Sequence, residues 1–153
     1  MKPLQKLQEL EYISRYADKP NYPEYARYKK KYSDKTANGL TKCIIDWVKF
    51  NGGFAERINT MGVPMDKRKV VTNVIGQQQQ VGSLEWRRSG ATRGSADVSC
   101  VINGKAIKVE VKAGRDRQSE AQKRYQAEVE RAGAIYFIAR NFDEFVEFYN
   151  TLT

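Results

Sequence analysis

The pair Asn103–Gly104 lies between two runs in which apolar and polar residues alternate, and it constrains the fold more than any other feature of the sequence. A two-residue type I′ turn needs positive φ at both central positions, and Asn-Gly is the pair that tolerates this best. The sequence therefore predicts an antiparallel hairpin with strands over 96–102 and 106–112. In that register, position 97 lies roughly opposite position 110.

The second strand of this hairpin has one polar face. Because side chains alternate along a strand, Glu110 and Lys112 share a face, and the other face is apolar, with Ile107, Val109 and Val111. A carboxylate and an amine are therefore expected side by side near the end of the strand.

Asp97 brings a second carboxylate to the same place, from the neighbouring strand. Two carboxylates this close destabilise each other unless a cation lies between them. The chain has no histidine, and oxygen ligands without histidine or thiolate favour Mg²⁺ or Mn²⁺. Taken alone, Asp97, Glu110 and Lys112 also fit an exposed cross-strand salt-bridge cluster, worth about 0.2–1 kcal/mol per pair.

Composition limits the classes of function that remain. The chain has 153 residues, 41% of them hydrophobic, which suits one domain with its own core. Lys and Arg number 27 against 18 Asp and Glu, and the formal charge of +9 favours a polyanion partner. The absence of histidine excludes His-based triads and the usual zinc sites.

The sequence also predicts a soluble chain in the cytoplasm, with no membrane partner. No apolar run approaches the roughly 20 residues of a membrane span, and the N-terminus lacks the apolar part of a signal peptide. Both cysteines, Cys43 and Cys100, are expected to stay reduced there.

Periodicity predicts the other elements. Helices are expected near residues 4–13, 38–51, 119–132 and 143–152. Strands are expected at 54–60 and at 134–140, the second fully buried because its apolar run is unbroken. A β excursion is expected over 61–93, its two arms separated by the glutamines at 77–80. A strand, helix, strand unit implies a right-handed parallel crossover, so the fold class is α/β, with a mixed sheet and helices on both faces.

The N-terminal arm, residues 1–35, mixes basic residues with most of the tyrosines. Pro20 and Pro23 argue against one continuous helix between residues 16 and 35. Amines that meet phosphates and rings that stack on bases suit nucleic-acid binding. A surface arm whose tyrosines pack on the body of the protein fits the same composition.

An ordered set of motifs resembles a known family. The segments "GSAD", "VEVK" and "QSEAQ" follow one another, with the hairpin between the first two and a helix beginning at the third. This order resembles the PD-(D/E)XK nuclease superfamily, VRR-NUC type, over residues 37–153. The resemblance implies a restriction-endonuclease-like fold over 36–153, with 61–93 as an insertion and 1–35 as an added arm. It also implies a phage or a mobile element as the source.

The resemblance assigns roles to the polar residues of the hairpin. It implies that Asp97, Glu110 and the backbone carbonyl of Val111 bind Mg²⁺, for which Mn²⁺ would substitute. It makes Lys112 the amine that positions or polarises the attacking water.

Gln122 has two interpretations. As the glutamine of the family it would face the catalytic cluster, and as a residue of a capping box it would turn back to Ser119. Many relatives carry a further acidic ligand in the first helix of the domain. This chain has Asn38, Thr41 and Asp46 there, which favours one bound ion over two.

The predicted DNA contacts are arginines beside the hairpin and in the excursion: Arg57, Arg87, Arg88, Arg115 and Arg117. Together with the resemblance, they predict a Mg²⁺-dependent DNA endonuclease that prefers flap, fork or junction DNA. One alternative is a catalytically inactive DNA-binding or assembly module on a nuclease-like fold. Another is a sequence-specific, restriction-type nuclease. A homodimer is left open, because related junction-cutting enzymes are dimers.

Overall fold

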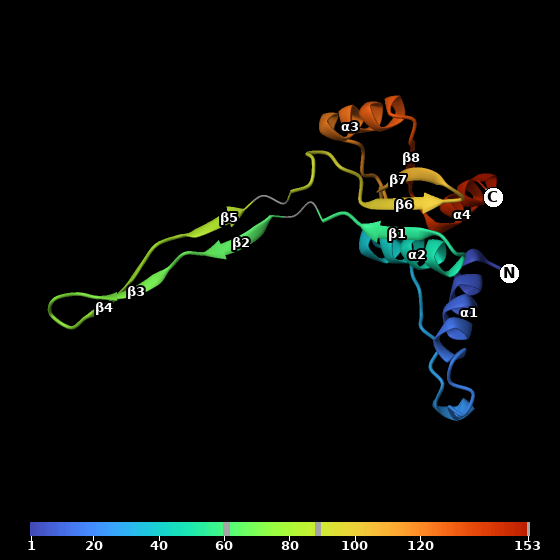
Figure 1. Ribbon diagram of the computed structural model, residues 1–153, viewed down its shortest axis with the longest axis horizontal. Helices are drawn as coiled ribbons and strands as arrows, with labels where there is room; N and C mark the ends of the chain where they lie inside the picture. The colour runs from blue at the N-terminus through green and yellow to red at the C-terminus, as the bar shows by residue number, and fades with distance from the viewer. Residues whose placement is uncertain (60–61, 88–89, 153) are drawn as a thin grey trace. The chain divides into compact units, whose positions relative to one another are not determined.

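The computed structural model describes residues 1–59, 62–87 and 90–152 (Figure 1). The chain forms two compact units. The main unit comprises Met1–Ile58 and Arg93–Thr153, and the hairpin unit comprises Asn59–Thr92. Each unit is described separately below.

A four-stranded mixed sheet forms the centre of the main unit. Its strands are β1 (Phe54–Arg57), β6 (Val98–Ile102), β7 (Lys105–Val111) and β8 (Ile135–Ala139), in the order β1-β6-β7-β8. The first two pairings are antiparallel, and β7 pairs with β8 in parallel. The predicted α/β class with a mixed sheet is therefore confirmed.

The predicted hairpin forms in the predicted register. Asn103 and Gly104 have φ angles of 48° and 76°, as a type I′ turn requires. Val98 lies opposite Val109, so position 97 extends the same register toward position 110. The first strand is shorter than predicted, because β6 begins after Asp97, and β7 has the predicted length but lies one residue earlier, from Lys105 to Val111.

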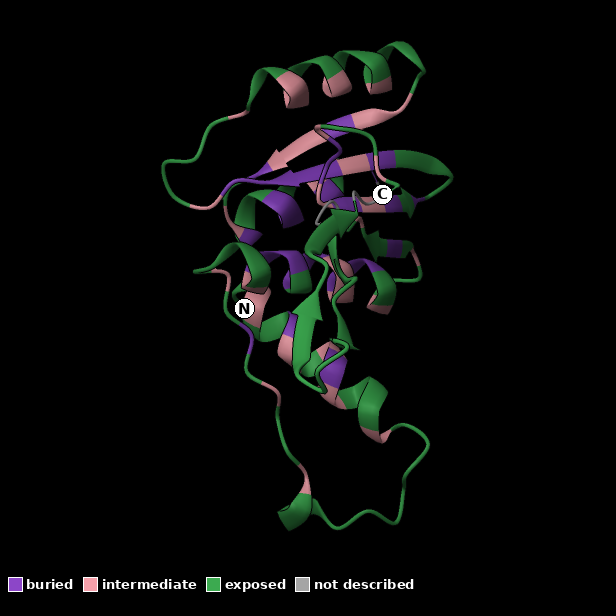
Figure 2. Cartoon of the chain, turned by 90° about the vertical axis from the view of Figure 1, so that its left-hand side faces the viewer, coloured by how far each residue is buried: buried purple, intermediate pink, exposed green. Residues whose placement is uncertain are grey.

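Helices cover both faces of the sheet. On one face, α2 (Ala37–Phe50) and α4 (Phe142–Leu152) pack on the strands, and α1 (Pro3–Tyr16) packs on both helices. The apolar side of β7 contributes Ile107, Val109 and Val111 to the core on this face. On the other face lies α3 (Glu120–Arg131), which has no buried residue (Figure 2).

The prediction that the last strand is fully buried was wrong. In β8 only Tyr136 and Ala139 are buried, and the other residues are partly exposed. This strand is at the edge of the sheet, and α3 covers its outer face only loosely. Strand β1 also ends earlier than predicted, at Arg57, while Thr60 lies outside the described residues.

The second part of the arm is an extended segment that packs on the helices. As predicted, residues 17–35 contain no long helix, only the short 3₁₀ turn η1 (Glu24–Ala26). Asp46 of α2 accepts hydrogen bonds from Lys30 Nζ (2.9 Å) and Tyr32 Oη (2.6 Å). The carboxylate of Asp34 accepts the backbone N–H of Phe142 (3.1 Å) at the start of α4. The segment is therefore fixed to two helices.

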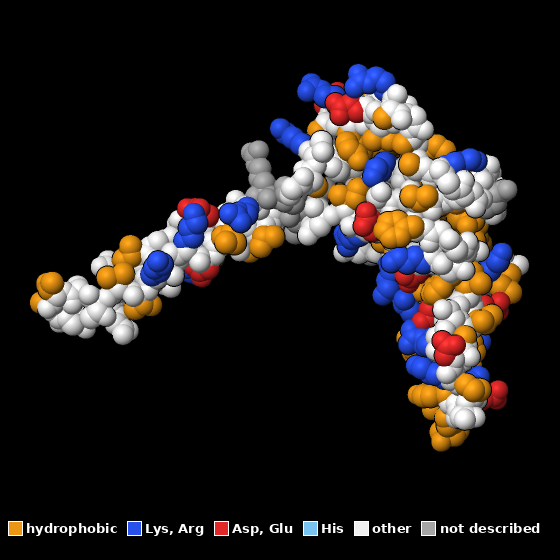
Figure 3. Space-filling view, in the orientation of Figure 1, with side chains coloured by type: hydrophobic (Ala, Val, Ile, Leu, Met, Phe, Trp, Pro, Cys, Tyr) orange, Lys and Arg blue, Asp and Glu red, His pale blue; other side chains and the backbone are white. Residues whose placement is uncertain are grey.

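The hairpin unit is a ribbon of two antiparallel strands in two short ladders. The inner ladder pairs β2 (Val63–Asp66) with β5 (Leu84–Arg87), and the outer pairs β3 (Lys69–Thr72) with β4 (Gln78–Val81). All four strands are exposed, with apolar side chains along the ribbon (Figure 3). None of its described residues belongs to the hydrophobic core.

The glutamine tract does not connect the two arms, contrary to the prediction. Gln78 to Gln80 lie in β4, and the chain reverses direction between Asn73 and Gln77. The side-chain carbonyl of Asn73 accepts the backbone N–H groups of Ile75 (3.2 Å) and Gln77 (2.8 Å). Asn73 thus forms an Asx-type turn. The prediction placed the turn at the four glutamines and missed this asparagine.

None of the helices in the described parts of the chain has the length and apolar character needed to cross a membrane.

Candidate active site

The end of β7 that lies farthest from the hairpin turn carries a buried polar cluster. Glu110 is 2% exposed and Lys112 is 6% exposed, and both belong to the side of the strand opposite the apolar core. The Lys112 ammonium lies 3.3 Å from Glu110 Oε1. An exposed salt-bridge cluster therefore does not describe this site, because charged side chains are seldom buried without a specific arrangement.

Asp97 lies directly across from this cluster. Its Oδ2 accepts the backbone N–H of Val111 (2.9 Å), and its own carbonyl accepts the N–H of Ile58 (2.8 Å). The carboxylate of Asp97 is thus held on the backbone of β7, while its carbonyl pairs with the residue after β1, and the negative charge of the carboxylate acts on Glu110. Asp97 and Glu110 therefore lie near each other on adjoining strands, as the hairpin register predicted.

A glycine fixes the approach of α3 to this segment. Gly94 has a φ of +84°, and a Cβ at this position would lie 2.4 Å from the backbone oxygen of Ala121. Only glycine accommodates both the left-handed backbone and this close approach. The chain just before Asp97 therefore contacts the first turn of α3.

Gln122 satisfies both of its predicted interpretations at once. Its Oε1 accepts the backbone N–H of Ser119 (2.9 Å), while Ser119 Oγ accepts the N–H of Gln122 (3.3 Å), which completes a capping box. At the same time its Nε2 donates to Glu110 Oε1. The amide therefore joins the start of α3 to the buried carboxylate.

Burial and charge set the protonation of the cluster. Burial, together with the negative charge of Asp97, raises the pKa of Glu110 to about 7, against the opposing effect of Lys112. Burial lowers the pKa of Lys112, but hydrogen bonds to Asp116 (3.0 Å) and to Glu110 outweigh it and raise the pKa overall. Lys112 is thus a fixed cation beside a carboxyl group that titrates near neutral pH.

Three residues near the cluster were not identified from the sequence. Tyr136 Oη donates to Glu110 Oε2 (3.4 Å), and Asp116 accepts a hydrogen bond from Lys112. The pKa of Asp116 is lowered mainly by Lys112 and to a smaller extent by the charge of Arg140, which lies nearby. Tyr136 is the one hydroxyl in an otherwise apolar strand, and Arg140 directly follows that strand. The carboxyl ends of two parallel strands lie at the same edge of a sheet. The sequence therefore contained the information that Arg140, directly after the last strand, lies near Lys112 at the end of the strand before it.

The donor set fits a hard divalent cation with few protein ligands. Among the described residues, no three acidic or cysteine side chains form a group that could hold a metal. Asp97 and Glu110 supply two carboxylates, and Val111 lies between Glu110 and Lys112 at the end of the strand. Mg²⁺ is commonly held by one or two carboxylates and keeps several waters for exchange with substrate phosphate.

The first helix of the domain offers no further acid to this site. Asp46 is bound by Lys30 and Tyr32 of the arm. Thr41 Oγ1 donates to the carbonyl of Ala37 (2.8 Å), and Asn38 Oδ1 accepts from Arg57 (2.9 Å).

The predicted DNA contacts fall in three places. Arg57 ends β1 beside Asp97, and Arg115 and Arg117 lie exposed in the loop after β7. Arg87 lies exposed in β5 of the hairpin unit, and Arg88 lies outside the described residues. Of the five, the structure brings Arg57, Arg115 and Arg117 to the strands that carry the cluster.

No family model, curated protein or solved structure matches the chain.

Proposed function

We propose that this chain is a Mg²⁺-dependent DNA endonuclease of the restriction-endonuclease-like fold, similar to the VRR-NUC type. The order of its elements supports this proposal: a helix, an antiparallel three-stranded run, a crossover helix and a parallel edge strand. The basic composition, with a formal charge of +9, favours a polyanionic substrate.

A single observation carries the proposal. The carboxylate of Asp97 accepts the backbone N–H of Val111, which places it next to the buried pair of Glu110 and Lys112, and its charge acts on Glu110. Burying the charged groups of Glu110 and Lys112 costs stability unless the arrangement is used, and perturbed carboxyl groups gather at functional sites.

Each residue has a defined task in phosphodiester hydrolysis. Asp97 and Glu110 would hold Mg²⁺, and bound Mg²⁺ supplies an acidified water and neutralises negative charge on the phosphate. Gln122 and Tyr136 orient the carboxylate of Glu110 through hydrogen bonds. Lys112, held by Asp116 and Glu110, places a positive charge where the attacking water and the phosphate oxygens would lie.

Conservative substitutions test this proposal. Asp97→Asn keeps an oxygen that accepts the Val111 N–H but removes a charge, so we expect an intact fold and loss of Mg²⁺-dependent cleavage. Lys112→Met should act likewise. The substrates are linear, flap, fork and four-way DNA, assayed with Mg²⁺ and with EDTA. Cleavage by Asp97→Asn at the wild-type rate would contradict the assignment.

The alternative function is a DNA-binding or assembly module that has lost catalysis. Among the described residues, no third acidic side chain joins Asp97 and Glu110 in a group that could hold a metal, which favours this alternative. Calorimetric titration with Mn²⁺ separates the two. A nuclease binds Mn²⁺ and loses that binding in Asp97→Asn, whereas a scaffold gives no heat of binding in either chain.

A further inference from the structure

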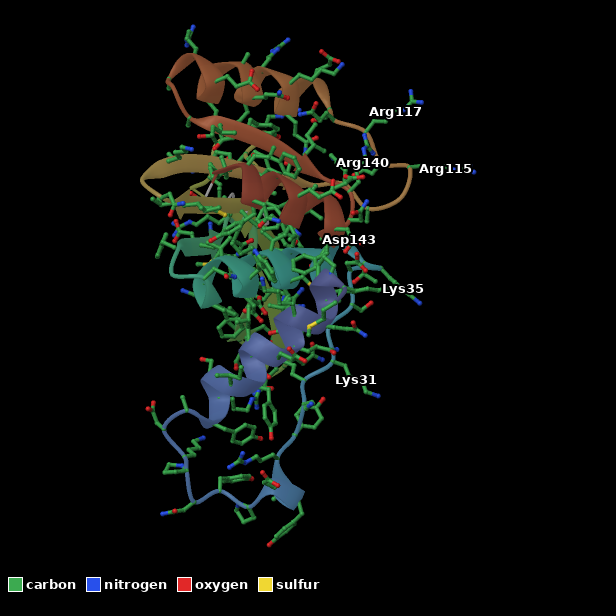
Figure 4. All side chains as sticks on the ribbon, turned by 90° about the vertical axis from the view of Figure 1, so that its right-hand side faces the viewer. Lys31, Lys35, Arg115, Arg117, Arg140 and Asp143 are labelled. Atoms are coloured by element: carbon green, nitrogen blue, oxygen red, sulfur yellow. The ribbon has the colours of Figure 1, made fainter. Side chains whose placement is uncertain are left out.

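Five exposed basic side chains follow one edge of the main unit: Arg117, Arg115, Arg140, Lys35 and Lys31. We call them the basic row. Figure 4 shows them one after another along this edge, with Arg115, Lys35 and Lys31 directed away from the body of the unit. They come from the loop after β7, the end of β8 and the second part of the arm.

Hydrogen bonds join these three segments, so the row is continuous in the fold. The N–H of Lys112 donates to the carbonyl of Ala139 (2.9 Å), which brings the ends of β7 and β8 together next to Arg140. The N–H of Phe142, two residues after Arg140, donates to Asp34 (3.1 Å), the neighbour of Lys35. The row therefore begins at the candidate site and continues onto the arm.

The arm presents its lysines by strict alternation. From residue 30 to residue 35, the even positions are buried or partly buried and the odd positions are exposed. Lys30 and Tyr32 bind Asp46, and Asp34 binds α4, so Lys31 and Lys35 face solvent. Their exposure thus follows from the packing of their neighbours.

The acidic residue within the row is already engaged: Asp116, between Arg115 and Arg117, accepts a hydrogen bond from Lys112 (3.0 Å) and lies close to Arg140. Among the described residues, no carboxylate forms an ion pair with Lys31, Lys35, Arg115 or Arg117. Asp143, the one acidic residue labelled with the row in Figure 4, is in the first turn of α4. An unpaired run of cations on a fixed surface suits a chain of phosphates.

Exposed aromatic rings lie beyond the end of the row. Tyr28 is 60% exposed and Tyr25 is 93% exposed, and both precede Lys31 along the same segment. Rings next to a basic track bind single strands, because unpaired bases stack on them while duplex bases are already stacked. The arrangement therefore favours a single strand over a duplex.

We propose that the basic row binds the phosphates of a single-stranded DNA tail that extends from the candidate site, and that Tyr25 and Tyr28 stack on its bases. This inference rests on the proposed function, since it takes the site as the start of the row. It makes a duplex with a single-stranded tail the preferred DNA.

Binding without cleavage tests the row. Fluorescence anisotropy in EDTA would compare full-length wild type with Lys31→Gln/Lys35→Gln, on a blunt duplex and on the same duplex with a 20-nucleotide tail. We expect the double variant to bind the tailed DNA about tenfold more weakly and the blunt duplex within about twofold of wild type. The slope of log K against log salt for the tailed DNA should fall by about 1.4, for two lost contacts with a single strand.

A matched control removes the same charge elsewhere. Lys49, in the last turn of α2, and Lys105, beside the hairpin turn, lie at the other end of the sheet from the cluster. Lys49→Gln/Lys105→Gln should bind both DNAs as wild type does. Tyr25→Leu keeps an apolar side chain but removes the ring, and it should weaken binding of the tail about fivefold or more.

The outcomes separate this inference from the proposed function. If Lys31→Gln/Lys35→Gln loses affinity equally for blunt and tailed DNA, the single-strand assignment is overturned. The same holds if the control variant loses as much affinity for the tailed DNA, or if poly-glutamate competes as strongly as single-stranded DNA. A loss of affinity for the tailed DNA alone supports the binding of a single strand by the basic row, whether or not the chain cleaves DNA. If cleavage depends on Asp97 but tail binding is unchanged in the row variants, the nuclease proposal stands and the row fails.

Discussion

At the scale of single residues, the amide of Gln122 has two structural tasks. Its oxygen helps to cap α3, and its nitrogen binds Glu110. The sequence could not decide between these tasks, because a glutamine at this position fits both a capping box and the motif of the resembled family. Tyr136 was missed for a related reason, since one phenol in an apolar strand usually indicates packing.

A pair of substitutions separates the two tasks of Gln122. Ser119→Ala and Gln122→Ala both disrupt the capping box, so we expect each to lower the free energy of unfolding by about 1 kcal/mol. Only Gln122→Ala removes the hydrogen bond to Glu110, so it alone should lower kcat, by about 10- to 100-fold. Urea unfolding and cleavage kinetics measure the two effects. Equal kcat values in the two variants would show that the contact with Glu110 is not used.

The raised pKa of Glu110 predicts how stability depends on pH in EDTA. The folded chain holds this proton up to about pH 7, whereas the ordinary pKa of the group is 4.5. Between these values the folded state binds more protons than the unfolded state, so stability falls as the pH rises. From pH 5 to pH 7.5 the wild type should lose on the order of 2 kcal/mol more than Glu110→Gln, measured by urea unfolding. Parallel pH profiles for the two chains would contradict the raised pKa.

At the scale of elements, short-range rules predicted most of the main unit. The turn at Asn103–Gly104 fixed the hairpin register, and that register placed Asp97 near Glu110. The excursion was predicted less well, because its turn is formed by Asn73 and not by the glutamines. The docking of Asp34 on α4 spans 108 positions in the sequence, and no local pattern encodes such a contact.

The contact between Gly94 and α3 predicts a large effect of a single methyl group. Gly94 and Gly133 have nearly the same φ, +84° and +86°, but only Gly94 has atoms within 4 Å of an added Cβ. Gly133→Ala should lower the free energy of unfolding by about 1 kcal/mol, the strain of placing alanine at a positive φ. Gly94→Ala should lower the free energy of unfolding by more than this, because its Cβ would push the segment before Asp97 away from α3. It should weaken Mn²⁺ binding as well, because Asp97 moves with that segment. Calorimetry and thermal unfolding measure both effects, and equal losses in the two variants would refute the contact.

At the scale of the whole molecule, the two units differ in what stabilises them. The main unit has one core, which includes Leu7 and Tyr32 of the arm. The described residues of the hairpin unit contribute nothing to that core. They are held by ladder hydrogen bonds, the turn contacts of Asn73 and exposed ion pairs, and an isolated two-stranded hairpin is marginally stable in water.

Removal of the hairpin unit is therefore expected to leave the main unit folded. Replacement of residues 62–87 by a short Gly-Ser linker should change Tm by no more than about 4 °C, because the described residues of the ribbon add nothing to the core. Leu7→Ala, in contrast, removes a fully buried side chain and should cost about 2–5 kcal/mol. Thermal unfolding compares the variants. A collapse of Tm on hairpin removal would show that the main unit depends on it.

The outer half of the ribbon contains no charged residue from Val70 to Ser83. Screening by salt weakens the attraction of lysine and arginine for phosphate, but sulfate strengthens contacts between apolar surfaces. On the proposed function, ammonium sulfate should therefore act in opposite directions on the two units: it should weaken the binding of nucleic acid to the main unit and promote self-association through the valines and isoleucine of the ribbon.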